Sequence, residues 1–193
     1  MSSTKKIALF ASGSGTNVAN IIRYFRGNDR VEIVLVVTNK PDAGVISRAE
    51  KLKIPVKVFD RKTIMETDLV NRELKMLHTD LIVLAGFLLK IPSSLIKDFP
   101  DRMINIHPAL LPKFGGKGMY GMRVHQAVLE ARETKSGITI HKVNEHYDEG
   151  QILFQAELQI REGETPESLA ARIHELEYLY YPKVIGDFLF SDL

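Results

Sequence analysis

The sequence contains no cysteine among its 193 residues. It therefore has no disulfide framework, no thiolate zinc site and no cysteine nucleophile, and it suits a reducing compartment, for which we expect the cytoplasm. It also lacks an excess of charge of one sign, because 26 lysines and arginines face 24 aspartates and glutamates. This near-balance gives no support to nucleic-acid binding, which calls for a basic surface.

Long hydrophobic runs are absent as well. The longest, over residues 33–37 and 81–89, are about as long as a buried strand, whereas a membrane-spanning helix needs roughly 18 apolar residues. Hydrophobic residues make up 45% of the chain and charged residues 26%, which is typical of globular proteins and excludes disorder as the main state. The length predicts one domain over residues 1–193.

The first hundred residues alternate between strand and helix patterns. Val18, Ile21, Ile22 and Phe25 recur at the spacing of an amphipathic helix. Periodicity and turn residues predict further helices over 45–52 and 63–77, and strands over 7–11, 31–37, 56–59 and 81–85. Alternating units of this kind imply a mostly parallel sheet with right-handed crossovers.

The pattern changes after Pro100. We predict a strand over 103–106, a helix over 124–132, and an antiparallel pair formed by 138–143 and 152–158. Thr165 and Pro166 then mark the start of a long helix that reaches Phe188 and is interrupted near Pro182. The predicted fold is α/β, a doubly wound, mostly parallel open sheet with an antiparallel extension in the C-terminal half.

A glycine turn, residues 12–17 with the sequence Ser-Gly-Ser-Gly-Thr-Asn, separates the first predicted strand from the first predicted helix. Free backbone amides and the positive helix end suit such a turn to phosphate. The motif alone is equally consistent with a turn that only joins strand to helix. Binding of NAD is disfavoured, because Thr38 and Asn39 stand after the second strand, where an acidic residue would hold the ribose.

Asn105 and His107 lie two residues apart in a predicted strand, so both side chains face the same side at its carboxyl end. Ligands bind at that edge in open α/β sheets. An amide that donates to a developing oxyanion, beside an imidazole that moves a proton, suits acyl-group chemistry. We therefore favour a functional role over a pair of polar groups that merely satisfy each other.

A polar loop between the two antiparallel strands contains Asp148. Its carboxylate, if placed next to His107, would raise the pKa of that imidazole and fix its tautomer, although the loop taken alone favours a solvated turn rich in acids. A metal site built from His141 and His146 is disfavoured, because no recognised ligand spacing is present. The other histidines, at positions 78, 125 and 174, are expected at surface or helix positions.

Four motifs occur in a fixed order: Gly-Ser-Gly-Thr-Asn at 13–17, Leu-Ala-Gly-Phe at 84–87, Asn-Ile-His-Pro-Ala-Leu-Leu-Pro at 105–112 and Asp-Glu-Gly at 148–150. Together they resemble the phosphoribosylglycinamide formyltransferases over essentially the whole chain. The Asn-x-His-Pro segment alone marks the wider group of 10-formyltetrahydrofolate-dependent formyltransferases. That group includes methionyl-tRNA formyltransferase and formyltetrahydrofolate deformylase, which carry an additional domain, so the length of this chain favours the first family.

The resemblance implies a Rossmann-like formyltransferase fold, with a phosphate-binding half over roughly 1–100 and a catalytic, folate-facing half over roughly 101–193. It implies transfer of a formyl group from 10-formyltetrahydrofolate, as co-substrate, to the amine of phosphoribosylglycinamide in purine biosynthesis, with no metal. Asn105 would hydrogen-bond the formyl oxygen and His107 would stabilise the tetrahedral intermediate and act as general acid. Asp148 would raise the pKa of His107 and help to relay the proton that leaves the amine.

The resemblance also implies binding residues for two small-molecule substrates. The amides of Gly15, Thr16 and Asn17 would hold the phosphate of the ribonucleotide, Glu177 would bind the ribose hydroxyls, and His174 matches a polar position near the phosphate. The pterin head of the folate would lie against Asn105, Asn144 and the backbone of four consecutive residues, Leu88, Leu89, Lys90 and Ile91. Nucleic acid and membranes are not implied as partners, and either a monomer or a homodimer is consistent with the sequence.

Two departures from the family pattern limit the transfer of roles. Thr67 stands where the family often has an arginine near the folate tail, and Lys90 or Arg61 is a candidate substitute. The connector over 113–123 is longer and richer in glycine than usual, so a lid there would close differently. Two alternatives remain open: a formyltransferase acting on another amine, and a catalytically silent nucleotide- or folate-binding module.

Overall fold

The computed structural model describes residues 4–191, and these residues form two compact units. Unit 1 comprises Met1–Ile104 and unit 2 comprises Asn105–Leu193. The strands are ordered β3-β2-β1-β4-β5-β6-β7 in the sheet. None of the helices between residues 4 and 191 has the length and apolar character needed to span a bilayer.

Unit 1 contains four parallel strands, β1 (Lys5–Phe10), β2 (Val31–Thr38), β3 (Val56–Val58) and β4 (Leu81–Leu84). Strand β1 pairs with β2 on one side and β4 on the other, and β2 also pairs with β3. The central strands are buried along most of their length, as expected for strands covered on both faces. The parallel arrangement predicted for this half is confirmed.

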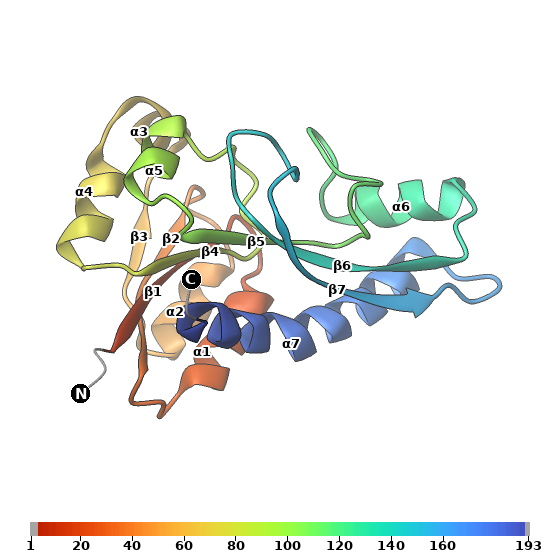
Figure 1. The fold of residues 1–193 in the computed structure, drawn as a ribbon, viewed down its shortest axis with the longest axis horizontal. Coiled ribbons are helices and arrows are strands. Elements are labelled where there is room, and N and C mark those ends of the chain that lie inside the picture. The colour runs from red at the N-terminus through yellow and green to blue at the C-terminus, as the bar shows by residue number, and fades with distance from the viewer. Residues whose placement is uncertain (1–3, 192–193) are drawn as a thin grey trace. The chain divides into compact units, whose positions relative to one another are not determined.

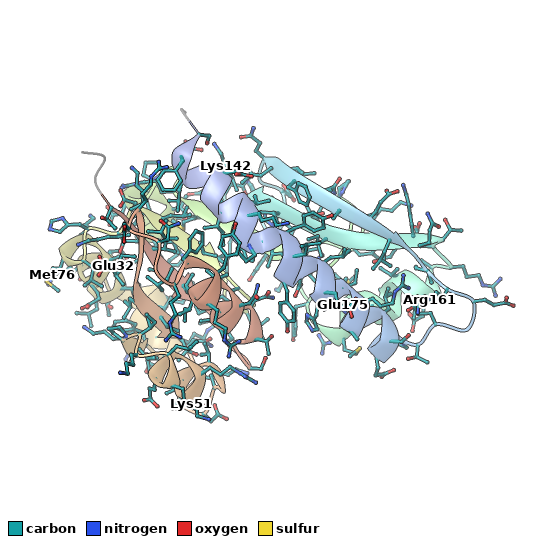
Figure 2. All side chains as sticks on the ribbon, turned by 90° about the horizontal axis from the view of Figure 1, so that it is seen from below. Glu32, Lys51, Met76, Lys142, Arg161 and Glu175 are labelled. Atoms are coloured by element: carbon teal, nitrogen blue, oxygen red, sulfur yellow. The ribbon has the colours of Figure 1, made fainter. Side chains whose placement is uncertain are left out.

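Helices cover both faces of the unit 1 strands. Helices α1 (Thr16–Phe25) and α2 (Val45–Lys51) lie together on one side, and α3 (Arg61–Glu66), α4 (Leu69–Met76) and α5 (Ser93–Asp98) lie together on the other (Figure 1). The apolar stripe predicted for α1 is buried in full. Charged side chains such as Lys51 lie on the outside of the unit (Figure 2).

The single helix predicted over 63–77 is wrong, because the chain forms α3 and α4 with a break between them. Thr67 ends α3 in extended backbone, and its hydroxyl donates to the carbonyl oxygen of Thr63 at 2.7 Å. The same hydroxyl accepts a hydrogen bond from the amide of Leu69 at the start of α4. Side-chain hydrogen bonds of this type compete with helical ones. Helix α5 was not predicted.

Unit 2 begins within β5 (Met103–His107) and contains β6 (Lys135–Lys142), β7 (Ile152–Gln159), α6 (Met122–Glu130) and α7 (Pro166–Phe190). Strands β6 and β7 pair in antiparallel fashion, so the predicted antiparallel extension is confirmed and with it the predicted fold class. Helix α7 packs along β6 and β7 and against α6, and exposed residues such as Glu175 lie on its outer side (Figure 2).

The predicted interruption of the last helix at Pro182 is wrong. Helix α7 continues through Pro182, with Tyr181 and Ile185 buried on either side of it. Its amino end has the predicted cap, since the Thr165 hydroxyl accepts a hydrogen bond from the amide of Ser168 and the Ser168 hydroxyl accepts one from the amide of Thr165. A proline removes one helical hydrogen bond; burial of the flanking side chains compensates for that loss.

Candidate functional site

The glycine turn of unit 1 follows the carboxyl end of β1 and leads into α1. Gly15 is the N-cap of α1 and has a φ of 76°. A Cβ at this position would lie 2.5 Å from Cγ2 of Val45, so both the backbone angle and the packing require glycine. The first turn of α1, which is fully described, carries no acidic residue. Amides in the first turn of a helix lack helical partners, so this turn has the properties of an anion site.

Ser12 ties the glycine turn to two other segments of unit 1. Its hydroxyl donates to Oδ1 of Asn39 at 2.5 Å and accepts a hydrogen bond from the amide of Leu88 at 2.9 Å. Its own amide donates to the carbonyl oxygen of Gly86. Asn39 stands where a NAD-binding fold would have an acidic residue, and its side chain instead accepts a hydrogen bond from Ser12 within unit 1.

The segment 88–91, predicted to hold the pterin, is only partly accessible through its side chains. Leu88 and Lys90 are exposed and Leu89 is half-buried, but the side chain of Ile91 is in the core with 5% of its surface exposed. The hydrogen bond from Leu88 to Ser12 holds the start of this segment beside the glycine turn.

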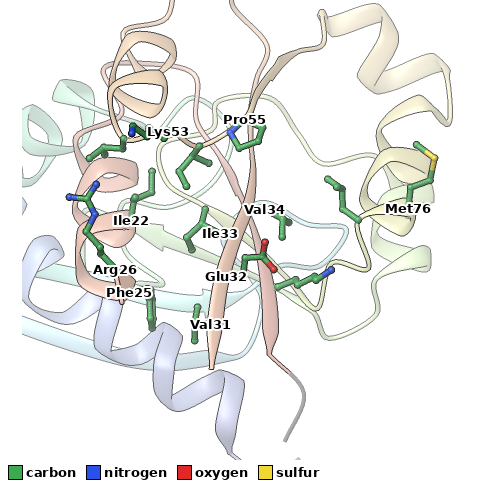
Figure 3. A pocket seen from close by; sticks show the side chains of 14 residues that line it. Ile22, Phe25, Arg26, Val31, Glu32, Ile33, Val34, Lys53, Pro55 and Met76 are labelled. Atoms are coloured by element: carbon green, nitrogen blue, oxygen red, sulfur yellow. The ribbon is translucent and has the colours of Figure 1, made fainter. Parts of the chain in front are cut away.

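A pocket also lies at the opposite, amino ends of β1 and β2 (Figure 3). It is lined by apolar side chains, including Phe25 of α1 and Ile33 of β2, together with Lys53 and Pro55 from the segment before β3. None of the predicted site residues lines this pocket. It is separate from the glycine turn, because the turn follows the carboxyl end of β1.

The centre of unit 2 is a cluster of polar side chains around the carboxylate of Asp148, which we call the Asp148 cluster: Asn105, His107, His141 and Asp148. Oδ2 of Asp148 lies 3.6 Å from Nδ1 of His107, and Oδ1 lies 3.6 Å from Nε2 of His141. Asn105 and His141 are joined through Nδ2 and Nε2, 3.1 Å apart. Both imidazoles are buried, with 3% and 2% of their surface exposed. All three predicted catalytic residues therefore lie together.

Hydrogen bonds to carbonyl oxygens indicate the tautomer of each imidazole. Nε2 of His107 lies 2.8 Å from the carbonyl oxygen of Phe114, and Nδ1 of His141 lies 2.8 Å from that of Lys142. A carbonyl oxygen can only accept, so these two nitrogens carry protons. When both rings are neutral, Nδ1 of His107 is unprotonated and faces Asp148. Nε2 of His141 is also unprotonated and accepts a hydrogen bond from the side-chain amide of Asn105.

Burial is the largest influence on the pKa of His107 and lowers it from the ordinary value of 6.5. The Asp148 carboxylate and the Phe114 carbonyl both act to raise the pKa, but they do not offset burial. Asp148 thus acts on this pKa in the predicted direction, and burial exceeds its effect. His107 is neutral near pH 7.

The pKa of Asp148 is lowered from its ordinary value. Burial alone would raise it, but His141, the positive charge that His107 can carry, and the hydrogen bond from the amide of Gly116 together outweigh burial. That amide donates to Oδ2 at 2.9 Å. Asp148 is therefore ionised and lies beside the unprotonated Nδ1 of His107. Protonation of that nitrogen would create a buried ion pair.

A close backbone approach positions the loop that carries Asp148. A Cβ at Gly150 would lie 1.7 Å from the carbonyl oxygen of Lys142, so only glycine lets the loop return so close to β6. Asp148 itself has a φ of 57°, a conformation that aspartate tolerates better than most residues. This explains physically why the Asp-Glu-Gly sequence places its carboxylate against both histidines.

Glu177 and His174, predicted to bind the ribonucleotide, form a pair on α7. Nδ1 of His174 lies 2.8 Å from Oε2 of Glu177; Glu177 is buried, whereas about half of the His174 side chain is exposed. The hydrogen bond to Glu177 is the largest influence on the pKa of His174 and raises it. Asn144 is exposed, and its Oδ1 accepts a hydrogen bond from the amide of His146. Its contact with folate stays a prediction.

Two buried histidines were underestimated from the sequence. His141 was considered only as a metal ligand, yet it completes the Asp148 cluster; its alternation with Thr139 along β6 was the available signal. His125 was assigned a generic helix position, but it is buried in α6. Among residues 4–191 there is no group of three or more histidine, aspartate or glutamate side chains that could hold a metal ion.

Comparison with known proteins places this geometry in context. Residues 5–185 match the model of the formyl transferase family. The chain is 44% identical over 188 residues to the chloroplastic phosphoribosylglycinamide formyltransferase of Arabidopsis thaliana, covering 94% of this chain and 64% of that protein. It is 39% identical to the phosphoribosylglycinamide formyltransferase of Haemophilus influenzae, covering 94% of this chain and 85% of the relative.

Solved structures of phosphoribosylglycinamide formyltransferases have a similar fold. The crystal structure of phosphoribosylglycinamide formyltransferase from Bacillus halodurans superposes with a TM-score of 0.88 at 34% identity, over 98% of this chain and 97% of that one. Against the plant proteins, however, the chain spans less than two thirds of the relative's length, 64% for Arabidopsis thaliana and 60% for Vigna unguiculata.

Proposed function

The chain belongs to the formyl transferase family, and from that premise we propose that it transfers the formyl group of 10-formyltetrahydrofolate to the amine of phosphoribosylglycinamide. The products are formylglycinamide ribonucleotide and tetrahydrofolate, in the biosynthesis of purines. The observation that carries the proposal is the Asp148 cluster, in which one carboxylate lies beside two buried histidines and an asparagine amide donates to one of them. Binding alone would not require this arrangement, so the cluster argues against a silent binding module.

The reaction needs orientation, charge stabilisation and proton transfer, but no side-chain nucleophile, because the substrate amine is itself the nucleophile. Its nitrogen attacks the formyl carbon, a carbon–nitrogen bond forms, and the formyl oxygen gains negative charge. The bond between the formyl carbon and N10 of the folate then breaks. Nδ2 of Asn105 has a second hydrogen besides the one directed at His141, and it donates that hydrogen to the formyl oxygen.

His107 handles the proton. Its bare Nδ1 accepts the proton that leaves the amine, relayed by Asp148, and the resulting imidazolium is stabilised by the carboxylate 3.6 Å away. The positive ring stabilises the oxyanion and then acts as general acid toward the leaving nitrogen of the folate. The neutral resting state of His107, which burial favours, is the state that this role requires.

The substrate-binding roles follow the same proposal. The amides of Gly15, Thr16 and Asn17 hold the phosphate, with His174 contributing charge, and Glu177 binds the ribose hydroxyls. The backbone of 88–91, Asn105 and Asn144 hold the pterin. Thr67 supplies no charge to the folate tail; its hydroxyl already donates to Thr63. A cytoplasmic location and a monomeric or dimeric state stay predictions, and the plant relatives are chloroplastic.

The test is a spectrophotometric assay with purified protein, phosphoribosylglycinamide and 10-formyltetrahydrofolate, in which the folate absorbance is followed. We expect an absorbance change only when the ribonucleotide is present. A change without the ribonucleotide would indicate a deformylase. No change in either mixture would contradict the proposal and favour another acceptor amine or a binding protein.

A further inference from the structure

The connector between β5 and α6 contacts both members of the His107–Asp148 pair through its backbone. The carbonyl oxygen of Phe114 lies 2.8 Å from Nε2 of His107, and the amide of Gly116 donates to Oδ2 of Asp148 at 2.9 Å. Oδ2 is also the carboxylate oxygen that lies 3.6 Å from Nδ1 of His107. Three consecutive residues, which we call the 114–116 segment, therefore contact the imidazole at one end of the pair and the carboxylate at the other.

The backbone of this segment is unusual and closely fitted to its neighbours. Phe114 has a φ of 57° and Gly116 has a φ of 94°. A phenylalanine adopts such a left-handed conformation only where its surroundings hold it there. Between these two residues, a Cβ at Gly115 would lie 2.6 Å from Cδ2 of Leu111 and 3.3 Å from Cβ of Asp148. The roles proposed above for the catalytic side chains give no reason for this fit.

Both ring nitrogens of His107 face a hydrogen-bond acceptor. Nε2 faces the carbonyl oxygen of Phe114 and Nδ1 faces the carboxylate of Asp148. A neutral imidazole carries one N–H group and can donate to only one of them. An ionised carboxylate is a stronger acceptor than a carbonyl oxygen. Asp148 alone would therefore draw the proton to Nδ1 and leave Nε2 unprotonated.

The 114–116 segment opposes that effect at both ends of the pair. Phe114 provides the acceptor that keeps the proton on Nε2. The amide of Gly116 gives Oδ2 the hydrogen bond that Nδ1–H of His107 would otherwise donate, and this weakens the attraction of the carboxylate for that proton. The distances agree, since the contact of the ring with the carbonyl oxygen is 2.8 Å and its contact with the carboxylate is 3.6 Å.

We propose that the 114–116 segment is a positioning element that selects the Nε2–H tautomer of His107 against the attraction of Asp148. Nδ1 is thereby kept unprotonated, in the state that can accept the proton released by the substrate amine. Once that proton has arrived, the imidazolium has an N–H group for each acceptor, Phe114 and Asp148. This inference rests on the proposed function for the use made of Nδ1, whereas the tautomer is a property of the free protein.

The tautomer can be measured from the imidazole nitrogen chemical shifts in NMR spectra of the protein with isotope-labelled histidine. Spectra are recorded above the lowered pKa of His107, where its ring is neutral, and the signals missing from His107→Ala are assigned to this ring. Gly116→Ala displaces the segment, because alanine is strained at a φ of 94°.

Gly118→Ala is the matched control. Gly118 has a φ of 90°, and a Cβ at either glycine would meet no atom within 4 Å, so the two alanines suffer the same kind of strain. Of the two glycines, only Gly116 has a hydrogen bond to the Asp148 cluster within residues 4–191. The melting temperature, kcat and the KM for the ribonucleotide are measured for both variants.

We expect wild-type His107 to carry its proton on Nε2 and Gly116→Ala to shift part of the population to the Nδ1–H tautomer. In Gly116→Ala, kcat should fall about tenfold, as for the loss of one hydrogen bond, while the KM for the ribonucleotide stays within a few-fold of wild type. Gly118→Ala should lower the melting temperature by a similar amount but keep the wild-type tautomer and kcat.

A proton on Nδ1 of His107 in the wild-type protein would overturn the proposal, and this measurement does not depend on how any variant folds. An unchanged tautomer in folded Gly116→Ala would also overturn it, as would an equal shift of the tautomer in Gly118→Ala. If the expected tautomers are found in wild type and in Gly116→Ala but no formyl transfer occurs, the proposed function is removed and the role of the segment stands.

Discussion

The glycine turn of unit 1 and the Asp148 cluster of unit 2 are built from different materials. The turn offers backbone amides at the start of α1, shaped by Gly15 and held by the hydrogen bonds of Ser12. The cluster consists of buried, titratable side chains that share one carboxylate. A site made of backbone keeps its charge distribution at every pH, whereas a site made of imidazoles and carboxylates changes with protonation.

Under the proposed function, this difference separates the residues that bind substrate from the residues that carry out the chemistry. Holding a phosphate requires a constant positive potential, which free amides and a helix end supply without titrating. Moving a proton requires a group whose protonation state can change near neutral pH. Substitutions in the turn should therefore alter KM and stability, and substitutions in the cluster should alter kcat and the pH profile. Three substitutions and a pH profile test this division.

His107→Ala should give the largest effect. In the proposed mechanism, removal of the imidazole abolishes proton transfer and the stabilisation of the oxyanion, so kcat should fall by about 10²–10⁴-fold. Ribonucleotide binding, measured by calorimetry, should stay within a few-fold of wild type. Equal losses of binding and turnover would mean that His107 is structural, and the division between the two regions would then fail.

Gly15→Ala should damage the turn without touching the chemistry. Alanine would be strained at a φ of 76° and would collide with Val45, so we expect a loss of roughly 1–3 kcal/mol of stability and about a tenfold rise in the KM for the ribonucleotide. Gly13→Ala is the matched control, because a Cβ there has no atom within 4 Å. Comparable defects in both variants, by melting temperature and steady-state kinetics, would show that the strain at Gly15 is not the cause.

Ser12→Ala should loosen the tie between the turn and the segment 88–91. It removes the partner of the Leu88 amide and of Asn39, which should cost about 1–2 kcal/mol of stability and raise the KM for folate a few-fold. Ser47→Ala serves as control, since Ser47 is exposed and its hydroxyl donates only to the carbonyl oxygen of Gly44. Chemical denaturation and substrate titrations would reveal the effect; a folate KM equal to that of the control would count against this tie.

The pH dependence should show the smallest effect and the clearest sign. Because burial lowers the pKa of His107 below 6.5, the neutral base persists into mildly acidic solution. The substrate amine must also be neutral to attack and titrates at about 8, so the acid limb of kcat/KM should contain two ionisations, that of the amine and a second, from His107, with an apparent pKa below 6.5. Asp148 acts to raise the pKa of His107, so Asp148→Asn should move the acid limb to still lower pH. A limb that moves upward in Asp148→Asn would contradict the assignment.

The same shift makes a statement about stability. The unfolded chain takes up a proton on this histidine below about pH 6.5, whereas the folded protein holds it neutral until its lower pKa is reached. The contribution of His107 to the free energy of folding is therefore fully present above pH 6.5. It declines as the pH falls from 6.5 toward the lower pKa of the folded protein. The stability contribution of His174 depends on pH in the opposite direction, because its pKa is raised in the folded protein. That contribution is present at low pH and is lost as the pH rises through the folded pKa.

Local sequence patterns predicted most of the fold. Elements with strong periodicity, such as α1, and the apolar strands β1, β2 and β4 appear close to where they were expected. The wrong predictions concern helix boundaries that depend on a single side chain. Thr67 divides a predicted helix in two, and α7 continues through Pro182, where an interruption was predicted. Such outcomes depend on individual hydrogen bonds and on burial, which periodicity does not report.

The chemistry available to this protein can be identified from local patterns: the Asn-x-His-Pro strand end, the acidic loop and the glycine turn each have a local physical cause. Which groups lie together depends on the tertiary structure. In the folded protein His141 lies beside Asp148 and Asn105, and burial lowers the pKa of His107. Nδ1 of His125 is buried there without a hydrogen-bond partner among residues 4–191. These properties arise from distance and desolvation between residues far apart in the chain, and no window of sequence contains that information.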